Sequence, residues 1–170
     1  MRPLLEYCVQ VWSPYKQKYI DLIENVQRRA TKLVPGLRRK TYDQRLDKLK
    51  LTRLVERRYR GDMIHAYNIM TNKGDYKRER FFQLARERGD PELHTGLKMY
   101  KKRARKSVRR NFFSQRVINP WNLEKREVVQ KEKTSGFKKG FDDEEKIRRI
   151  AREGRDERLY KLLFRVDNLR

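Results

Sequence analysis

Residues 13–36 read SPYKQKYIDLIENVQRRATKLVPG, and this stretch is the clearest indication of the fold. Its apolar stripe at helical spacing consists of Ile20, Ile23, Val26, Ala30 and Leu33. Residues three and four apart share one face of a helix, so the stretch predicts an amphipathic helix that buries this stripe. Ser13 and Pro14 suit the start of the helix, and Pro35 with Gly36 suits its end.

Similar helical signals lie on both sides of this stretch. Thr41 and Gln44 match a capping box that opens a short helix, and Thr52 suits the start of a longer one. Residues 111–121 predict a further helix, whereas residues 97–100 favour a short strand. Together these elements predict a mainly α fold: a small helical bundle with a short strand pair and a C-terminal amphipathic helix.

The composition of the chain favours an acidic partner. Its 170 residues include 46 Lys and Arg against 23 Asp and Glu, a net charge of +23. Such a chain repels itself unless polyanions neutralise it, and nucleic acid is the commonest polyanion. The single cysteine, Cys8, excludes an internal disulfide and every zinc module that needs several cysteines. We expect no metal, no cofactor and no membrane-spanning segment.

The charge is unevenly distributed along the chain. Residues 1–141 hold 37 basic and 15 acidic side chains, whereas residues 142–170 hold 9 and 8. This shift and the turn signal at Gly89-Asp90-Pro91 predict three parts. They are a helical bundle over 1–88, a basic strand and helix extension over 89–141, and an amphipathic helix over 142–170.

Two stretches are the candidate nucleic-acid-binding sites. The first holds Arg28, Arg29, Lys32, Arg38, Arg39 and Lys40. The second holds Lys98, Lys101, Lys102, Arg103, Arg105, Lys106, Arg109, Arg110 and Arg116, and no acidic residue occurs between 94 and 123. Phosphates repeat along a nucleic-acid strand, so charge of one sign can neutralise several of them and release their counterions. The alternative for each stretch is a solvated charged face.

Aromatic residues flank the second stretch, and catalytic signals are nearly absent. Tyr100, Phe112 and Phe113 could stack on unpaired bases, but the helical spacing of Phe112 and Phe113 places them in the core. The acidic run 142–145 follows Phe141 without the spacing of a polymerase metal site and is typical of a helix start. The sequence therefore predicts a binding protein and not an enzyme.

Several of these stretches also resemble a known family. Residues 2–15, 24–38, 54–62, 101–105 and 111–122 are similar, in the same order, to the thumb and post-thumb region of LINE-type (non-LTR, jockey-like) retrotransposon reverse transcriptases. The resemblance covers about residues 1–141 and ends after Phe137-Lys138. It implies a thumb-like bundle that grips template RNA and RNA–DNA hybrid, with the catalytic palm and fingers upstream of this chain.

The resemblance leaves several interpretations open. The first is non-catalytic binding of RNA, RNA–DNA hybrid or DNA through phosphate contacts. A second is a protein-interaction or scaffold module that acts through residues 142–170, and a third is a retroelement remnant without a selected function. A fourth is a chain that works only in a complex that restores a palm subunit. We expect an intracellular location, because the chain has one cysteine and no pattern of a signal peptide. The basic run 101–106 is compatible with nuclear import, so we expect the nucleus over the cytoplasm, but phosphate binding explains the run equally well.

Overall fold

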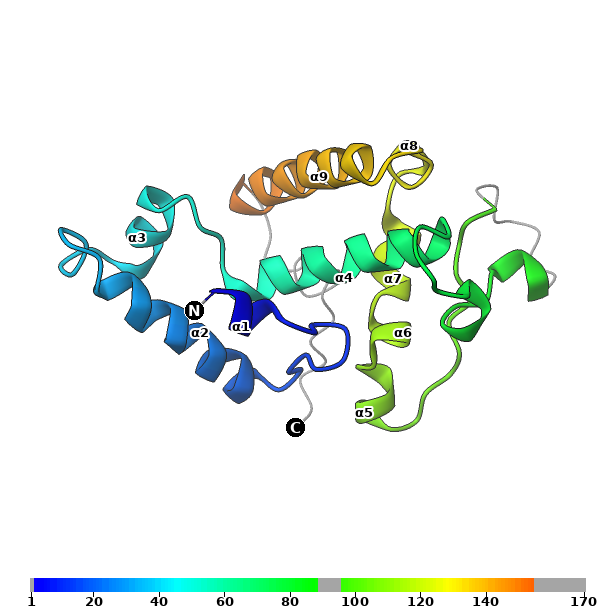
Figure 1. Cartoon of the computed structure of the whole chain (residues 1–170), viewed down its shortest axis with the longest axis horizontal. Helices are drawn as coiled ribbons and strands as arrows, with labels where there is room; N and C mark the ends of the chain where they lie inside the picture. The colour runs from blue at the N-terminus through cyan, green and yellow to red at the C-terminus, as the bar shows by residue number, and fades with distance from the viewer. Residues whose placement is uncertain (1, 89–95, 155–170) are drawn as a thin grey trace. The chain divides into compact units, whose positions relative to one another are not determined.

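The computed structural model describes residues 2–88 and 96–154 and is mainly helical there, as predicted (Figure 1). The helices are α1 (Arg2–Glu6), α2 (Gln17–Lys32), α3 (Tyr42–Lys48), α4 (Leu54–Met70), α5 (Ser107–Arg110), α6 (Phe113–Arg116), α7 (Ile118–Leu123), α8 (Arg126–Val129) and α9 (Thr134–Gly154), with short 3-10 helices at Arg78–Arg80 and Ala85–Arg88. The predicted strand pair does not form in these residues. Leu84 and Met99 make only an isolated antiparallel bridge.

The chain divides into two compact units. The first comprises Met1–Ala66 and Lys102–Val117, and the second comprises Tyr67–Lys101 and Ile118–Arg170. These limits differ from the parts predicted from charge and turn signals. The predicted limit between residues 141 and 142 falls inside α9, and residues 155–170 of the predicted C-terminal helix lie outside the described residues.

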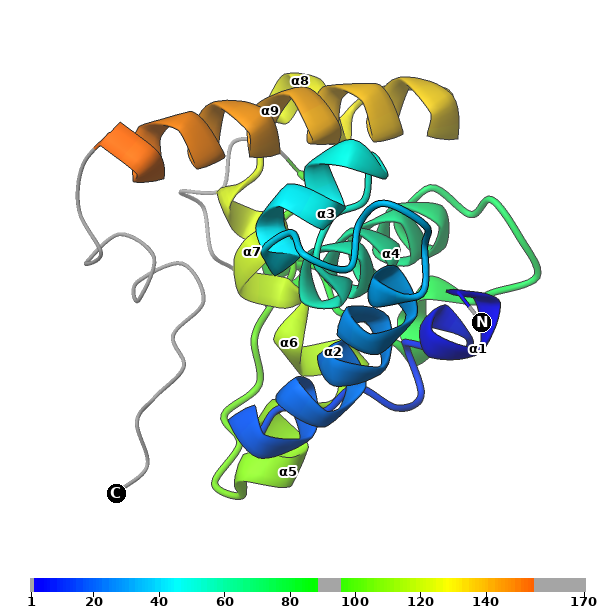
Figure 2. The ribbon, with the colours of Figure 1, turned by 90° about the vertical axis from the view of Figure 1, so that its left-hand side faces the viewer.

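Helices α2 and α3 of the first unit lie against each other and are joined by a loop over residues 33–41 (Figure 2). The predicted capping box opens α3. The backbone N–H of Gln44 donates to Thr41 Oγ1 over 3.3 Å, and the N–H of Thr41 donates to Gln44 Oε1 over 3.1 Å. Gly36 turns the chain in the loop with a φ of +77°, a conformation that only glycine adopts without strain. The end of α2 and the start of α3 are thereby brought together.

Helix α2 buries a polar face, which corrects the prediction of a buried apolar stripe. The buried residues of α2 are Glu24, Gln27 and Thr31, whereas Val26 and Leu33 are exposed. The helix also begins at Gln17 and not at Ser13 or Pro14. The polar side chains are buried because they serve α3 and α4. Glu24 Oε2, for example, accepts a hydrogen bond of 2.9 Å from the N–H of Leu54 at the start of α4.

An aromatic cluster forms the core of the second unit. Phe137 of α9 stacks on Tyr67 with ring centroids 4.2 Å apart, and Phe141 lies one helical turn further on at 5.9 Å from Phe137. The buried Trp121 donates through Nε1 to the carbonyl of Leu97 over 2.9 Å. Helix α9 also packs on α8 in this unit (Figure 1).

Candidate nucleic-acid interface

A cationic pocket lies where α2, the 33–41 loop and α3 meet. We call it the α2–α3 pocket; its lining residues are Asn25, Arg28, Arg29, Lys32, Arg38, Lys40, Tyr42 and Arg45. Its volume is about 590 Å³, within the range of about 300–1,000 Å³ that is typical of sites for small ligands. Six of the eight lining side chains are cationic and none is acidic. The lining therefore creates a positive potential, which favours anions over cations.

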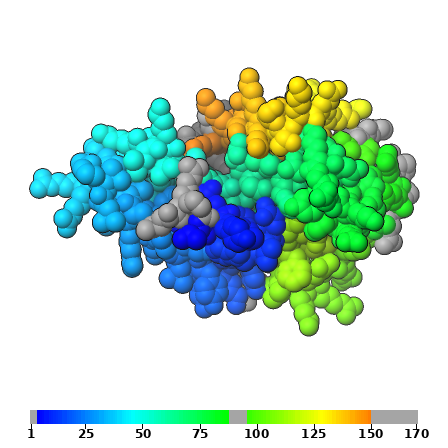
Figure 3. Space-filling view, in the orientation of Figure 1, coloured from blue at the N-terminus to red at the C-terminus, as the bar shows by residue number. Residues whose placement is uncertain are grey.

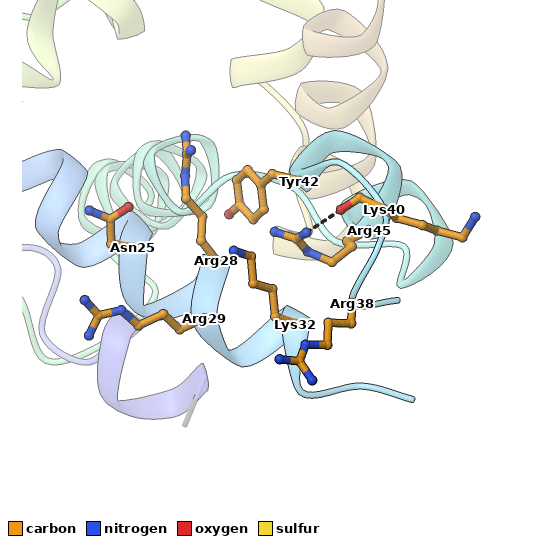
Figure 4. Close-up of a pocket in the computed structure, with 8 residues that line it drawn as sticks. All are labelled: Asn25, Arg28, Arg29, Lys32, Arg38, Lys40, Tyr42 and Arg45. Atoms are coloured by element: carbon orange, nitrogen blue, oxygen red, sulfur yellow. Dashed lines mark hydrogen bonds between the residues drawn. The ribbon is translucent and has the colours of Figure 1, made fainter. Parts of the chain in front are cut away.

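Figure 4 shows how the lining side chains are directed. Lys32 extends its ammonium group towards Tyr42 and the guanidinium of Arg45. Arg29 and Lys40 extend outwards at the rim. In the space-filling view, side chains of the loop and of α3, coloured light blue to cyan, project from the surface (Figure 3). The pocket thus has the buried Arg45 at its centre, with the ammonium group of the exposed Lys32 directed towards it, and Arg29 and Lys40 at the rim.

Arg45 is held in place at the centre of the pocket. Arg45 is only 3% exposed, and its Nε donates a hydrogen bond of 3.0 Å to Thr31 Oγ1. Its Nη1 donates to the carbonyl of Lys40. Its Nη2 has no hydrogen-bond partner among the described residues. Because burial and two bonds already order this side chain, binding of an anion at Nη2 costs little further side-chain entropy.

Tyr42 forms one wall of the pocket as a neutral phenol. Its hydroxyl donates to the buried Glu24 and accepts a 2.8 Å hydrogen bond from Gln27 Nε2. Burial and the bond to Glu24 raise the pKa of Tyr42 to about 12, so the hydroxyl keeps its proton at neutral pH. The guanidinium groups of Arg28 and Arg45 lie 4.7 and 5.6 Å from the ring centroid. These cation–π contacts attach the two arginines to the wall.

The pocket contains five of the six residues predicted in the first basic stretch. Arg39 is exposed but does not line it. Asn25, Tyr42 and Arg45 also line it, although the sequence did not predict them because none of them belongs to the uninterrupted basic run. The signal that could have found Arg45 is its position one turn into the helix that the Thr41 capping box opens directly after the basic loop.

The second basic stretch is divided between the two units. Lys98 and Lys101 belong to the second unit, and the other members belong to the first. We call residues 102–110 the basic segment. The chain is extended or bent until Lys106 and then forms α5. Six of the predicted side chains are exposed on this segment: Lys102, Arg103, Arg105, Lys106, Arg109 and Arg110.

Arg116 is half-buried, and its guanidinium is bonded within the first unit. Its Nε and Nη2 donate to the two carboxylate oxygens of the buried Asp62 over 2.8 and 3.0 Å. Its Nη2 also donates to the carbonyl of Val9, and its Nη1 donates to the carbonyl of Asn111. These four bonds occupy the guanidinium. We therefore leave Arg116 out of the candidate interface.

The two phenylalanines that follow the basic segment have different environments. Phe113 is buried, with its ring centroid 5.3 Å from that of His65. Phe112 was also predicted in the core, but the structure leaves it 49% exposed. The guanidinium of Arg109 lies 5.4 Å from the centroid of its ring. An exposed ring beside cations is able to stack on an unpaired base. Tyr100, the third candidate, is half-buried.

Comparison with protein-family models, curated proteins and solved structures found no match for this chain. The resemblance to a reverse transcriptase thumb and the nuclear location therefore stay predictions. Among the described residues, no helix is both long enough and apolar enough to span a membrane. The same residues contain no group of three or more His, Cys, Asp and Glu side chains placed to hold a metal ion.

Proposed function

We propose that the first unit binds nucleic acid through its phosphates, largely independently of sequence and without a catalytic step. The observation that carries this proposal is the α2–α3 pocket, which gathers six cationic side chains and no acidic one. Without a ligand these charges repel one another, and a polyanion removes that repulsion while releasing its own counterions. The resemblance to a polymerase thumb supports RNA or RNA–DNA hybrid as the ligand.

The basic segment supplies the second part of the proposed surface. Its six exposed cations belong to the same unit as the pocket. Exposed Lys and Arg side chains contact phosphates without reading bases, so they contribute affinity and not sequence preference. Phe112 adds a ring on which an unpaired base can stack. This combination favours a strand with unpaired bases over a regular duplex.

The experiment is a fluorescence-anisotropy titration of the full chain with labelled single-stranded RNA, DNA and RNA–DNA hybrid at several salt concentrations. With six phosphate contacts, the logarithm of the association constant falls against that of the salt concentration with a slope of about −4 on single strands and about −5 on duplex. A variant carries glutamine at five positions of the basic segment: Lys102, Arg103, Arg105, Lys106 and Arg109. We expect weaker binding and a shallower slope for this variant.

The matched control removes the same charge from the second unit. It carries glutamine at five exposed lysines: Lys131, Lys133, Lys138, Lys139 and Lys146. If the first unit binds the strand, this control keeps most of the slope. Equal losses in the two variants would show a dependence on net charge alone and would contradict the proposed surface. A slope near zero for the unaltered chain would reject the function and favour the protein-interaction alternative.

A further inference from the structure

We propose that the α2–α3 pocket binds a run of directly linked phosphates, such as the 5′-triphosphate end of an RNA strand, while the basic segment binds the strand behind that end. This inference rests on the proposed function and deepens it. It assigns different parts of the ligand to the two cationic surfaces of the first unit.

The shape of the pocket favours a compact anion. A volume of about 590 Å³ admits a strand end or a small ligand but not a double helix. Within a strand, a sugar separates each phosphate from the next, whereas the phosphates of a triphosphate share bridging oxygens. The triphosphate therefore brings more negative charge into the same volume. Six cations around one pocket match that density better than they match a single phosphate.

The centre of the pocket contains a hydrogen-bond donor, Nη2 of Arg45, that has no acceptor among the described residues. Arg45 is more than nine-tenths buried, two of its nitrogens are bonded within the unit, and its Nη2 is unpartnered among residues 2–88 and 96–154. Lys32 extends its ammonium group towards the same place (Figure 4). Nη2 is not one of the side-chain nitrogens that are both buried and unpartnered, so solvent reaches it. A phosphate oxygen can replace water there and form a charge-assisted hydrogen bond.

The aromatic wall of the pocket is largely engaged within the unit. The Tyr42 ring is half-buried, guanidinium groups lie over it, and its hydroxyl is bonded to Glu24 and Gln27. It therefore offers a base less surface than the exposed ring of Phe112 does. Both oxygens of Glu24 are also occupied, by Tyr42 and by the backbone of Leu54. This carboxylate does not line the pocket, so it does not compete with a bound phosphate there.

The experiment compares three RNAs of one sequence, labelled at the 3′ end, that carry a 5′-triphosphate, a 5′-monophosphate or a 5′-hydroxyl. We expect the full chain to bind the triphosphate RNA about tenfold more tightly than the hydroxyl RNA, which corresponds to one good charge-assisted contact. Inorganic tripolyphosphate is added as a competitor. By occupying the pocket, it is expected to lower the affinity of the triphosphate RNA to that of the hydroxyl RNA, and to leave the hydroxyl RNA, which the basic segment binds, nearly unaffected.

Two neighbouring arginines provide the matched variants. Arg38 lines the pocket and Arg39 does not, and both are exposed residues of the same loop. Arg38→Gln and Lys32→Gln are expected to bring the ratio of the affinity for the triphosphate RNA to that for the hydroxyl RNA towards one. Arg39→Gln removes the same charge and is expected to keep the ratio. These variants alter exposed side chains, so a loss cannot be attributed to the misfolding that replacement of buried Arg45 would cause.

The outcomes separate this inference from the proposed function. Equal affinities for the three RNAs, with salt-sensitive binding of each, would overturn the end-binding inference and leave the proposed function standing. Equal effects of Arg38→Gln and Arg39→Gln on the ratio would also overturn it. A third outcome is that no RNA binds, while tripolyphosphate raises the melting temperature of the unaltered chain but not that of the Lys32→Gln variant. In that case the pocket binds a free polyphosphate, and the proposed function is rejected. If free tripolyphosphate binds the chain as tightly as the triphosphate RNA does, the linked phosphates alone are the ligand of the pocket. That result would overturn the part of the inference in which the basic segment binds the strand behind them.

Discussion

Replacement of Arg116 by glutamine tests the interior role that the structure gives to this residue. The side chains of Arg116 and Asp62 are 18% and 6% exposed, and two hydrogen bonds join them. Removal of one partner from a buried ion pair costs about 3–5 kcal/mol because the other charge is left uncompensated. A domain has only about 5–15 kcal/mol of total stability. We expect Arg116→Gln to remove much of the stability of the first unit.

The pH dependence of this loss has a definite sign. Burial raises the pKa of Asp62, while the hydrogen bonds and charge of Arg116 lower it. Without Arg116 the pKa of Asp62 rises further. A carboxyl whose pKa is higher in the folded state contributes stability below its unfolded pKa and loses it as the pH rises through the folded pKa. The loss of unfolding free energy in Arg116→Gln is therefore expected to become smaller as the pH falls from 7 towards the unfolded pKa of Asp62, about 4.

The assay is urea denaturation followed by fluorine NMR of protein labelled with fluorotryptophan. The chain has two tryptophans, Trp12 in the first unit and Trp121 in the second, so each unit has its own resonance. The double variant Asp62→Asn with Arg116→Gln is expected to recover part of the loss, with a coupling energy of up to about 3 kcal/mol. A loss below about 1 kcal/mol at pH 7, the value of an exposed salt bridge, would refute the reasoning.

Three further predictions concern single side chains. Phe137→Ala is expected to cost the second unit about 3–5 kcal/mol, because a fully buried ring that stacks on Tyr67 is lost; urea denaturation read at Trp121 measures it. Gly136→Ala is expected to gain about 0.5–1 kcal/mol, since the added Cβ would lie 3.6 Å from Lys131, an ordinary contact; an unchanged or lower melting temperature of the second unit would contradict this. Tyr42→Phe is expected to cost about 1–3 kcal/mol at pH 7 because Glu24 loses a donor. Since the pKa of Tyr42 is raised to about 12, its contribution is present below pH 10 and is lost as the pH rises towards 12. The difference in unfolding free energy between Tyr42→Phe and the unaltered chain should then be smaller in urea denaturations at pH 10–11 than at pH 7.

Local signals in the sequence were sufficient to predict that the fold is mainly helical and where some of the helices begin. The Thr41 capping box is confirmed because its hydrogen bonds join residues three positions apart and need no distant partner. The helix over 54–70 was also indicated by its own residues, although Glu24 of α2 accepts the hydrogen bond from the N–H of Leu54 at its start. The concentration of charge before residue 40 indicated most of the α2–α3 pocket, since the loop that forms the pocket is short and continuous with the stretch.

Only the tertiary structure decided which side chains are internal and which are available to a ligand. Arg116 and Arg109 are both cations of one uninterrupted basic stretch, yet Arg116 finds Asp62, 54 residues away in sequence, while Arg109 is exposed. Helix α2 buries Glu24 and Gln27 because α3 and α4 present donors and acceptors to that face. Helical periodicity identifies a face but not the groups that cover it. A charged or polar side chain is buried wherever a distant segment satisfies its hydrogen bonds, and that pairing exists only in the folded chain.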